Sequence, residues 1–298
     1  MTDGSRRLMV IALGGNAISP PRGDLSLATE RAIVQRAIAE IAPLVRDKTR
    51  LLIVHGNGPQ VGRLLTVSGV GDAESLDIHV AQTQGEIGYL IAESLDEQLG
   101  TDACVTLLTR VLVDAADPAF SNPTKPVGAV LDRKPEGVAA VRVAGGWRRV
   151  VPSPRPLAVI EQSAIAALLG AHHVIAGGGG GIALTRGERG RVARPAVIDK
   201  DYVAALLAIR LNAERLLFVT DVAHAFDGFG TNQPQPITRM SVAEARARLH
   251  KGAFAPGSMA PKIESAIEFV AATRRPAIVT TLGSIDAACR SEAGTTIE

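Results

Sequence analysis

The chain lacks the features that identify secreted, membrane and zinc-binding proteins. It has two cysteines, Cys104 and Cys289, which are far apart and form no C-x-x-C pair. Such cysteines indicate reduced thiols in a cytoplasmic protein rather than a disulfide framework. The six histidines are scattered and show no zinc-ligand spacing. We therefore expect no metal site built from side chains. Because no apolar run approaches the length of a signal peptide core or a membrane span, we also expect a cytoplasmic protein that does not bind membranes.

Further absences argue against nucleic-acid binding and against two common nucleotide sites. Only 3% of the residues are aromatic, the net charge is +2, and no long basic run occurs. The chain therefore offers neither a charged stripe nor a stacking surface to nucleic acid. It contains no G-x-x-x-x-G-K-[ST] motif, and Gly62 follows Gly56-Asn57-Gly58 one residue too late for G-x-G-x-x-G.

Two segments near the start of the chain share one pattern, an apolar run followed by glycine, asparagine and small residues. They are residues 8–17 (LMVIALGGNA) and 51–59 (LLIVHGNGP). Each is typical of a buried strand that ends in a glycine-rich turn, where backbone N–H groups bind anions. Because a helical stretch between them returns the chain to the same sheet edge, we expect both turns to face one crevice. The residues predicted to bind a small anionic substrate there are Gly14, Gly15, Asn16, Gly56, Asn57 and Gly58.

Strand-like and helix-like patterns alternate along the whole chain. Helical periodicity is clear over residues 27–41 and 77–99, whereas β-branched runs at 104–113, 216–222 and 277–281 are typical of strands. This alternation favours an α/β fold with a mainly parallel open sheet between two helical layers. A chain of 298 residues, 46% of them hydrophobic, has enough apolar side chains for such a core.

One long segment interrupts the alternation. Residues 114–146 contain four prolines and several glycines, with a helical pattern over 136–141. Such a connection is usually a functional lid or a small appended subdomain. A helix is then expected over residues 158–169.

No change in composition marks a linker, so the sequence predicts one domain of two lobes, about 1–175 and 176–298. A third glycine run, residues 177–181, follows another strand pattern at their boundary. It is equally consistent with a ligand-binding turn and with a hinge between the lobes.

Lysine is rare, since it accounts for six of the 32 basic residues. Lys125 lies between two prolines, and Lys200 and Lys262 each lie at the start of an expected helix. A cation at a helix start opposes the helix dipole, so stability alone does not explain two of them. Taken alone, Lys200 favours a solvated ion pair with Asp199 or Asp201. Taken together, the three lysines predict a clamp for a phosphoryl group.

Phosphoryl transfer requires positioned cations and N–H groups around the equatorial oxygens of the transferring group. An acceptor that is already anionic, such as a carboxylate or a carbamate, needs no general base. The sequence fits this chemistry, because no histidine or carboxylate forms a convincing nucleophile and base pair beside the glycine turns. His55, which precedes the second turn, is better explained by a structural hydrogen bond.

Segments spread almost from end to end match the pattern of one known family. They are ALGGNAI (12–18), HGNGPQVG (55–62), QTQGEIGY (82–89), NPTKPVG (122–128), GWRRVVPSPRP (146–156), AVIDKD (196–201), VTDV (219–222), FAPGSMAPKIESAI (254–267) and AGTTI (293–297). Through these segments the chain resembles the carbamate kinases of the amino acid kinase superfamily. The resemblance implies reversible phosphoryl transfer from ATP to carbamate, giving ADP and carbamoyl phosphate, with Mg²⁺ carried on the nucleotide. It also implies the amino acid kinase fold, a small protruding subdomain at 114–146 and a homodimer.

Carried over by motif, the resemblance assigns roles to individual residues. Lys125 would close over the phosphoryl group, Lys200 and Lys262 would neutralise charge during transfer, and Asp201 would organise the lysines. The first lobe would hold carbamate and the phosphoryl group, and the second the nucleotide. The residues expected at the nucleotide site are Gly178, Gly179, Thr220, Asp221, Val222, Phe229, Gly257, Ser258 and Met259.

Two departures from the family pattern concern closure and nucleotide binding. Ala129 occupies a position that is usually proline, and residues 224–226 differ from the usual acidic and aromatic pattern. Two alternatives remain, a related kinase acting on an amino acid carboxylate and a non-catalytic ligand-sensing homologue. The NPTKP and GWRRVVPSP segments favour carbamate, and retention of all three lysines favours an enzyme.

Overall fold

The computed structural model describes residues 7–19, 26–45, 49–68 and 75–298, without the side chains of Asn16 and residues 66–68. Its centre is an eight-stranded sheet in which all neighbours are parallel except one pair at 277–279 and 295–297. From edge to edge the strands are β15 (Arg239–Met240), β17 (Thr295–Ile297), β16 (Ala277–Thr281), β12 (Arg215–Thr220), β1 (Leu8–Leu13), β2 (Arg50–His55), β9 (His173–Ile175) and β3 (Cys104–Thr106).

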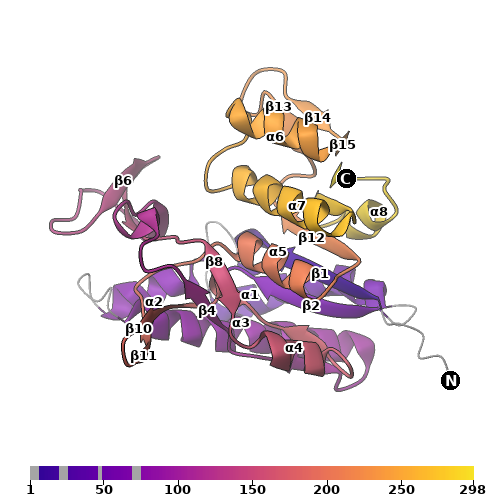
Figure 1. Cartoon of the computed structure of the whole chain (residues 1–298), viewed down its shortest axis with the longest axis horizontal. Helices are drawn as coiled ribbons and strands as arrows, with labels where there is room; N and C mark the ends of the chain where they lie inside the picture. The colour runs from indigo at the N-terminus through magenta and orange to yellow at the C-terminus, as the bar shows by residue number, and fades with distance from the viewer. Residues whose placement is uncertain (1–6, 20–25, 46–48, 69–74) are drawn as a thin grey trace.

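Helices cover both faces of this sheet (Figure 1). In β1 and β2, alternate residues face opposite cores: Val10 and Leu52 belong to one apolar cluster, and Ile11 and Ile53 to the other. The first cluster includes α4 (Gln162–Leu168), α5 (Lys200–Arg210), α6 (Val242–His250) and α7 (Met259–Thr273). The second includes α1 (Leu27–Ile41), α3 (Leu76–Leu99) and α8 (Ile285–Cys289). The predicted three-layer sandwich with a mainly parallel sheet is confirmed.

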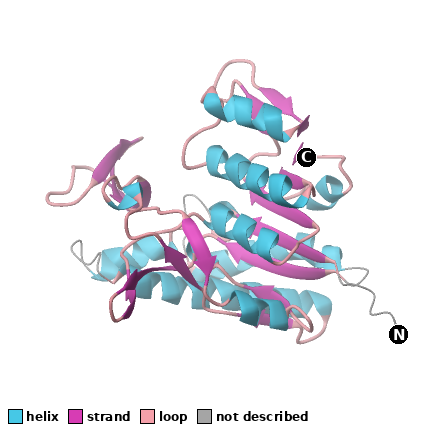
Figure 2. Cartoon of the chain, in the orientation of Figure 1, coloured by secondary structure: helices cyan, strands magenta, loops and turns pink. Residues whose placement is uncertain are grey.

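Smaller sheets extend the main body (Figure 2). One contains β11 (Gly190–Ala193), β10 (Ile182–Gly187), β4 (Arg110–Val113) and β8 (Pro156–Val159), and another pairs β13 (Ala225–Asp227) with β14 (Gln235–Ile237). A three-stranded antiparallel sheet projects from the body and consists of β5 (Lys125–Leu131), β7 (Gly146–Val151) and β6 (Ala140–Val143). We call these three strands the protruding subdomain.

The helical pattern at 136–141 was therefore a wrong prediction. Gly137 has a φ of +71°, which turns the chain, and β6 then pairs with β7 from Val143 opposite Gly146 to Ala140 opposite Arg149. The helix expected over 158–169 begins later than predicted, at Gln162. Strand β8 takes the preceding residues, because Val159 pairs with Val111 of β4.

The predicted strand at 104–113 is two strands in two different sheets. Between β3 and β4 the backbone of Thr109 is bound by Gln84 of α3, whose amide accepts from the Thr109 N–H (2.7 Å) and donates to its carbonyl (3.1 Å). Because these bonds satisfy the backbone at the crossing, the chain can leave one sheet for the next. The continuous β-branched sequence gives no sign of the break.

The helices also bear on membrane association. Within the described ranges, none of them combines the length and apolar character that a membrane span requires.

The remaining α-helix, α2 (Gln60–Ser68), follows the second glycine turn and packs against strand β5 of the protruding subdomain.

Two buried histidines predict that stability falls in mild acid. Burial, as the largest effect, lowers the pKa of His55 and of His173 to about 4. Their neutral rings bond to the backbone, since His55 Nδ1 donates to the Gly56 carbonyl (2.8 Å) and His173 Nδ1 accepts from the Leu51 N–H (3.1 Å). Between pH 6.5 and 4 the unfolded chain binds protons that the folded chain excludes. The free energy of unfolding therefore falls as pH falls, by at most about 1.4 kcal/mol per unit for each histidine.

Urea unfolding at pH 7 and pH 5 measures this dependence. His173→Gln should reduce the difference between the two pH values, whereas the neighbouring and more exposed His172→Gln should preserve it. An unfolding free energy that is equal at pH 7 and pH 5 in the unmodified protein would contradict the expectation.

Candidate active site

The two glycine turns face one another, as the sequence predicts. Strands β1 and β2 pair in parallel with Leu13 opposite His55, so their turns leave the sheet at the same edge. A Cβ on Gly15 would lie 3.6 Å from Gly58 Cα, and a Cβ on Gly14 only 2.9 Å from the Val219 carbonyl oxygen. Gly14 also donates its N–H to that oxygen (2.8 Å). The turns therefore meet through backbone, which leaves their surface open to a small ligand.

A cavity of about 590 Å³ opens beside these turns and collects most of the predicted residues. Those at its wall are Gly14, Gly15, Gly56, Asn57, Gly58, Lys125, Gly179, Lys200, Asp201, Thr220, Asp221, Gly257, Ser258 and Lys262. Four predicted residues are not at the wall, namely Gly178, Val222, Phe229 and Met259. The backbone of Asn16 lies in the 3-10 turn at 15–17, but its side chain is outside the described part of the structure.

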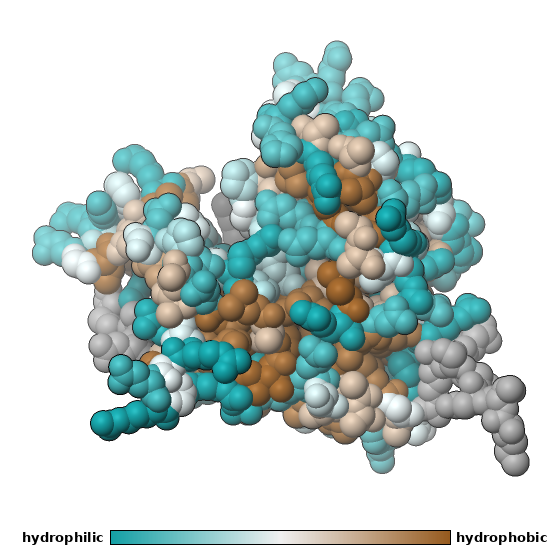
Figure 3. Space-filling model, in the orientation of Figure 1, coloured by the Kyte–Doolittle hydropathy of each residue, from teal (hydrophilic) through white to brown (hydrophobic). Residues whose placement is uncertain are grey.

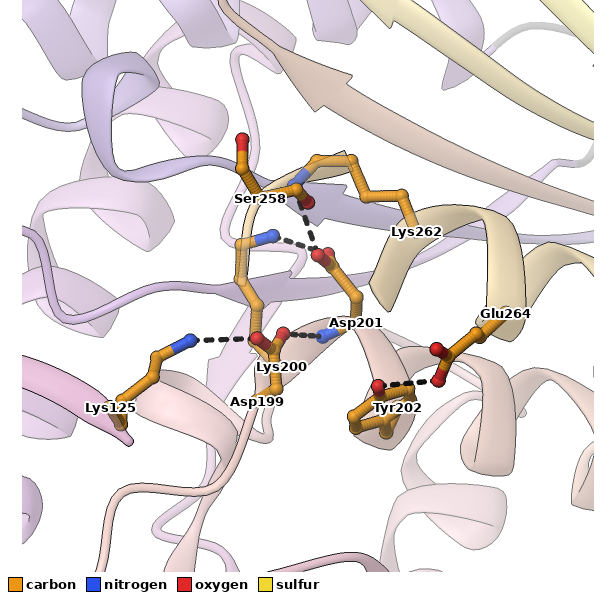
Figure 4. A network of polar contacts seen from close by, with 8 residues as sticks. All are labelled: Lys125, Asp199, Lys200, Asp201, Tyr202, Ser258, Lys262 and Glu264. Atoms are coloured by element: carbon orange, nitrogen blue, oxygen red, sulfur yellow. Dashed lines mark hydrogen bonds and ion pairs between the residues drawn. The ribbon is translucent and has the colours of Figure 1, made fainter. Parts of the chain in front are cut away.

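Asp201 binds two lysine side chains at once (Figure 4). One carboxylate oxygen, Oδ1, accepts from Lys200 Nζ at 2.5 Å, and Oδ2 accepts from Lys262 Nζ at 3.0 Å. Lys200 and Asp201 begin α5, while Lys262 comes from the first turn of α7. The three side chains are at most 10% exposed. The ion pair favoured for Lys200 alone does form with Asp201, but the prediction that it is solvated is wrong, because the pair is buried.

The charges of this cluster are strongly coupled. Burial opposes ionisation of Asp201, but the ammonium groups of Lys200 and Lys262 outweigh it and hold the pKa of the carboxyl well below its usual range. Burial is the main effect on Lys200 and lowers its pKa, whereas for Lys262 the attraction of Asp201 overcomes burial and raises the pKa. One carboxylate therefore orients two cations toward the cavity, where they can stabilise the charge of a transferring phosphoryl group.

The third lysine reaches the cavity from the protruding subdomain. Lys125 is the first residue of β5, and its Nζ lies 2.7 Å from Oδ2 of Asp199. Asp199 is the N-cap of α5 and precedes Lys200. This pairing of Asp199 with Lys125 was not predicted, because the two residues are 74 positions apart in the sequence.

The third glycine run is packed beneath the second turn. Residues 177–181 are all buried, and a Cβ on Gly178 would lie 2.4 Å from His55 Nε2. A Cβ on Gly179 would lie 1.9 Å from the Asn57 side-chain oxygen, which also accepts from Thr83 Oγ1 (3.0 Å). Because residues 177–181 are packed so closely, we interpret this run as a support for the turn that contains Asn57 rather than as a hinge between the lobes.

Two arginines at the cavity wall were missed by the sequence analysis. Arg63 of α2 makes two bonds to the fully buried Glu30, at 2.9 and 3.2 Å. Arg148 of β7 donates from Nε to the Gly128 carbonyl (3.1 Å). Arg63 lies one helical turn after HGNGP, a position that suggested no contact with the cavity because arginine is common throughout the chain.

Comparisons with known proteins define the class of protein. The profile of the amino acid kinase family matches residues 7–281, and the chain belongs to that family. An N-acetylglutamate synthase structure from Neisseria gonorrhoeae, 18% identical, has a TM-score of 0.58 over 98% of this chain and 61% of that one. At that identity the likeness shows the shared fold alone.

More similar relatives identify one group within the family. Carbamate kinase 1 of Enterococcus faecium is 40% identical over 93% of this chain and 94% of its own, and the Lentilactobacillus hilgardii carbamate kinase is 38% identical over 98% and 97%. The structure of Giardia lamblia carbamate kinase bound to AMP-PNP has a TM-score of 0.89 at 36% identity, over 98% of both chains. Within the amino acid kinase family, the chain belongs to the carbamate kinases.

Helix α2 can approach the protruding subdomain closely only because residue 62 is glycine, so a larger residue at this position should displace the subdomain. A Cβ on Gly62 would lie 2.6 Å from Gly128 Cα, so Gly62→Ala must push β5 and Lys125 away from the body. Because Lys125 lies at the cavity wall, we expect the reaction to be sensitive to its position, and kcat/KM should fall at least about tenfold. Steady-state kinetics of the purified variant measures the loss.

Gly85→Ala is the matched control. Gly85 also lies in a helix, but a Cβ there meets nothing within 4 Å. It should leave activity unchanged and raise the free energy of unfolding by about 0.5–1 kcal/mol. Equal kinetics for the two variants would show that the close approach at Gly62 does not position Lys125.

Proposed function

We propose that the protein transfers a phosphoryl group reversibly between ATP and carbamate, forming ADP and carbamoyl phosphate. The observation that carries this proposal is the buried cluster of Lys200, Asp201 and Lys262 beside the two glycine turns. Carbamate is already an anion and needs no base to attack phosphorus. Consistent with this, the histidine adjacent to the turns, His55, is buried with a lowered pKa and bonded to the backbone.

Each part of the cavity has a role in the proposed reaction. The N–H groups of the turns at residues 14–16 and 56–58 hold the carbamate and orient its oxygen for in-line attack. Lys200 and Lys262 stabilise the charge that spreads over the equatorial oxygens, and Asp201 keeps both lysines in place. Lys125 reaches the same group from the subdomain. The second lobe, residues 176–298, supplies the nucleotide site.

Two groups of residues are proposed for the nucleotide. Thr220, Asp221, Gly257 and Ser258 lie at the cavity wall together with Gly179. Farther along the chain from Asp221, His224, Phe226 and Phe229 form an aromatic group. The ring centroids of His224 and Phe226 lie 6.2 Å apart, and those of Phe226 and Phe229 lie 6.1 Å apart. Phe229 is 62% exposed, so its face is accessible to an adenine base. Val222 and Met259 lie next to these residues in sequence, and Gly178 acts through the turn that it supports.

Magnesium fits this site as an ion carried by the nucleotide. No group of three metal-binding side chains occurs among the described residues. Asp199 binds one lysine and Asp201 binds two, which leaves Asp221 as a carboxylate at the wall that could meet a metal bound to phosphate oxygens. When bound, the ion would neutralise phosphate charge, as is usual for Mg²⁺ with nucleotides.

We further propose a cytoplasmic homodimer. The space-filling view shows apolar surface gathered over β4, β8 and α5 (Figure 3). Leu157 of β8 is 52% exposed. Apolar surface of this kind is typical of a contact between subunits, and sedimentation of the purified protein tests it.

The reverse reaction provides the direct test of function. Purified protein with Mg²⁺, ADP and carbamoyl phosphate should form ATP, and acetyl phosphate and aminoacyl phosphates should be poorer donors. No ATP above the enzyme-free background would contradict the carbamate assignment. Preference for an aminoacyl phosphate would indicate a kinase for an amino acid carboxylate instead.

Lys262→Ala tests the lysine cluster in the same assay. We expect kcat to fall about 10²–10³-fold, the usual cost of removing one group that stabilises developing charge. Lys251→Ala, at an exposed lysine, should retain activity. A thermal unfolding curve for each variant shows whether it is folded, and normal kcat in folded Lys262→Ala would exclude the proposed role.

A further inference from the structure

We propose that Asp199 is a positioning residue that docks the protruding subdomain and fixes Lys125 at the cavity. The effect of this contact on catalysis rests on the proposed function, whereas the contact between Asp199 and Lys125 does not depend on that function. Asp199 lies at the cavity wall, and each of its two carboxylate oxygens already accepts a hydrogen bond from the protein. It acts through Lys125.

The two carboxylate oxygens of Asp199 have different partners. Oδ1 accepts from the backbone N–H of Asp201 at 3.1 Å, which caps α5, and Oδ2 accepts from Lys125 Nζ at 2.7 Å (Figure 4). One rigid carboxylate thus joins the helix that carries Lys200 and Asp201 to a strand of another sheet. Because the cap fixes the orientation of the carboxylate, Lys125 meets a preorganised partner.

The burial of this pair distinguishes it from an ordinary surface ion pair. The Asp199 side chain is 10% exposed and that of Lys125 is 27% exposed. Exposed pairs contribute little because water competes and two mobile side chains lose entropy. Here the Asp199 carboxylate is held in place and largely shielded from water, and its Oδ2 is hydrogen-bonded to one ammonium group, that of Lys125.

The apolar attachment of the subdomain positions strand β5, whereas the bond to Asp199 fixes the ammonium group of Lys125. Val127 and Val151 pack with Val61, Leu65 and Val197 in a small apolar cluster at the base of the subdomain. This cluster fixes where β5 meets the body but contains no polar group that could orient an ammonium. An ammonium has three N–H donors, so Lys125 can keep its bond to Asp199 and still donate to phosphoryl oxygens.

Asp199→Asn separates docking from helix capping. Asparagine caps helices as well as aspartate does, so the variant keeps α5 and loses the charge that holds Lys125. We expect kcat to fall about 100-fold with an unchanged melting temperature, the scale of loss for a misplaced catalytic group. Asp117→Asn is the control, because Asp117 also caps a helical turn, through Ala119 N–H, and is not at the cavity wall.

A double-mutant cycle with Lys125→Ala identifies the partner. If Asp199 acts through Lys125, Asp199→Asn should cause no further loss of kcat in the Lys125→Ala background. The charge of Asp199 also acts on Lys200 and Lys262. Losses that multiply in the double variant would show that Asp199 acts through those lysines, which would overturn the proposal.

Hydrogen exchange tests the docking without any activity. Amides of residues 125–131, 140–143 and 146–151 should exchange several-fold faster in Asp199→Asn, and equally faster in Lys125→Met. Unchanged exchange in both variants would overturn the docking role. An unmodified protein that lacks carbamate kinase activity yet shows faster exchange in the variants would refute the proposed function and leave the docking contact established.

Discussion

The site depends on a buried carboxylate that two ammonium groups share. Asp201 is almost wholly removed from water, and its charge is tolerable there because Lys200 and Lys262 each bind one of its oxygens. Removing one member of such a cluster leaves a buried charge without compensation, which typically costs about 3–5 kcal/mol. The same contacts hold the N-terminal ends of α5 and α7 beside one another, and so bring distant parts of the sequence to a single cavity.

The sheet places the other half of the site opposite that cluster. Both glycine turns extend from central strands, and the alternation of side chains along these strands anchors them in two separate cores. The surface of the two turns is therefore backbone anchored by the central strands, whereas the subdomain with Lys125 is joined to the body by a small apolar base and an ion pair. Reactions between two charged substrates benefit from this division, because one side is preorganised and the other can admit the substrate.

Much of this was predictable from local sequence, and the reason is physical. Parallel strands that end in glycine turns must share an edge, so LGGNA and HGNGP predicted one crevice. The three lysines were distinctive because lysine is rare in this chain and because these three lie between prolines or at the start of expected helices. The predictions that failed depended on contacts across the fold. The strand break at Thr109 is made by Gln84, and the contact of Lys125 with Asp199 joins strand β5 to the start of helix α5. Neither leaves a local pattern, and Arg63 and Arg148 were hidden among many similar residues.

The attachment of the glycine turns to the middle of the sheet has a consequence for partial unfolding. Strands with neighbours on both sides open only with the whole domain, whereas an appended antiparallel sheet on a narrow base opens by itself. Under mild denaturing conditions the amides around residues 14–16 and 56–58 should stay structured after the subdomain has lost its order. Such a molecule would still bind small anions while no longer transferring a phosphoryl group, so the loss of catalysis would precede the loss of ligand binding.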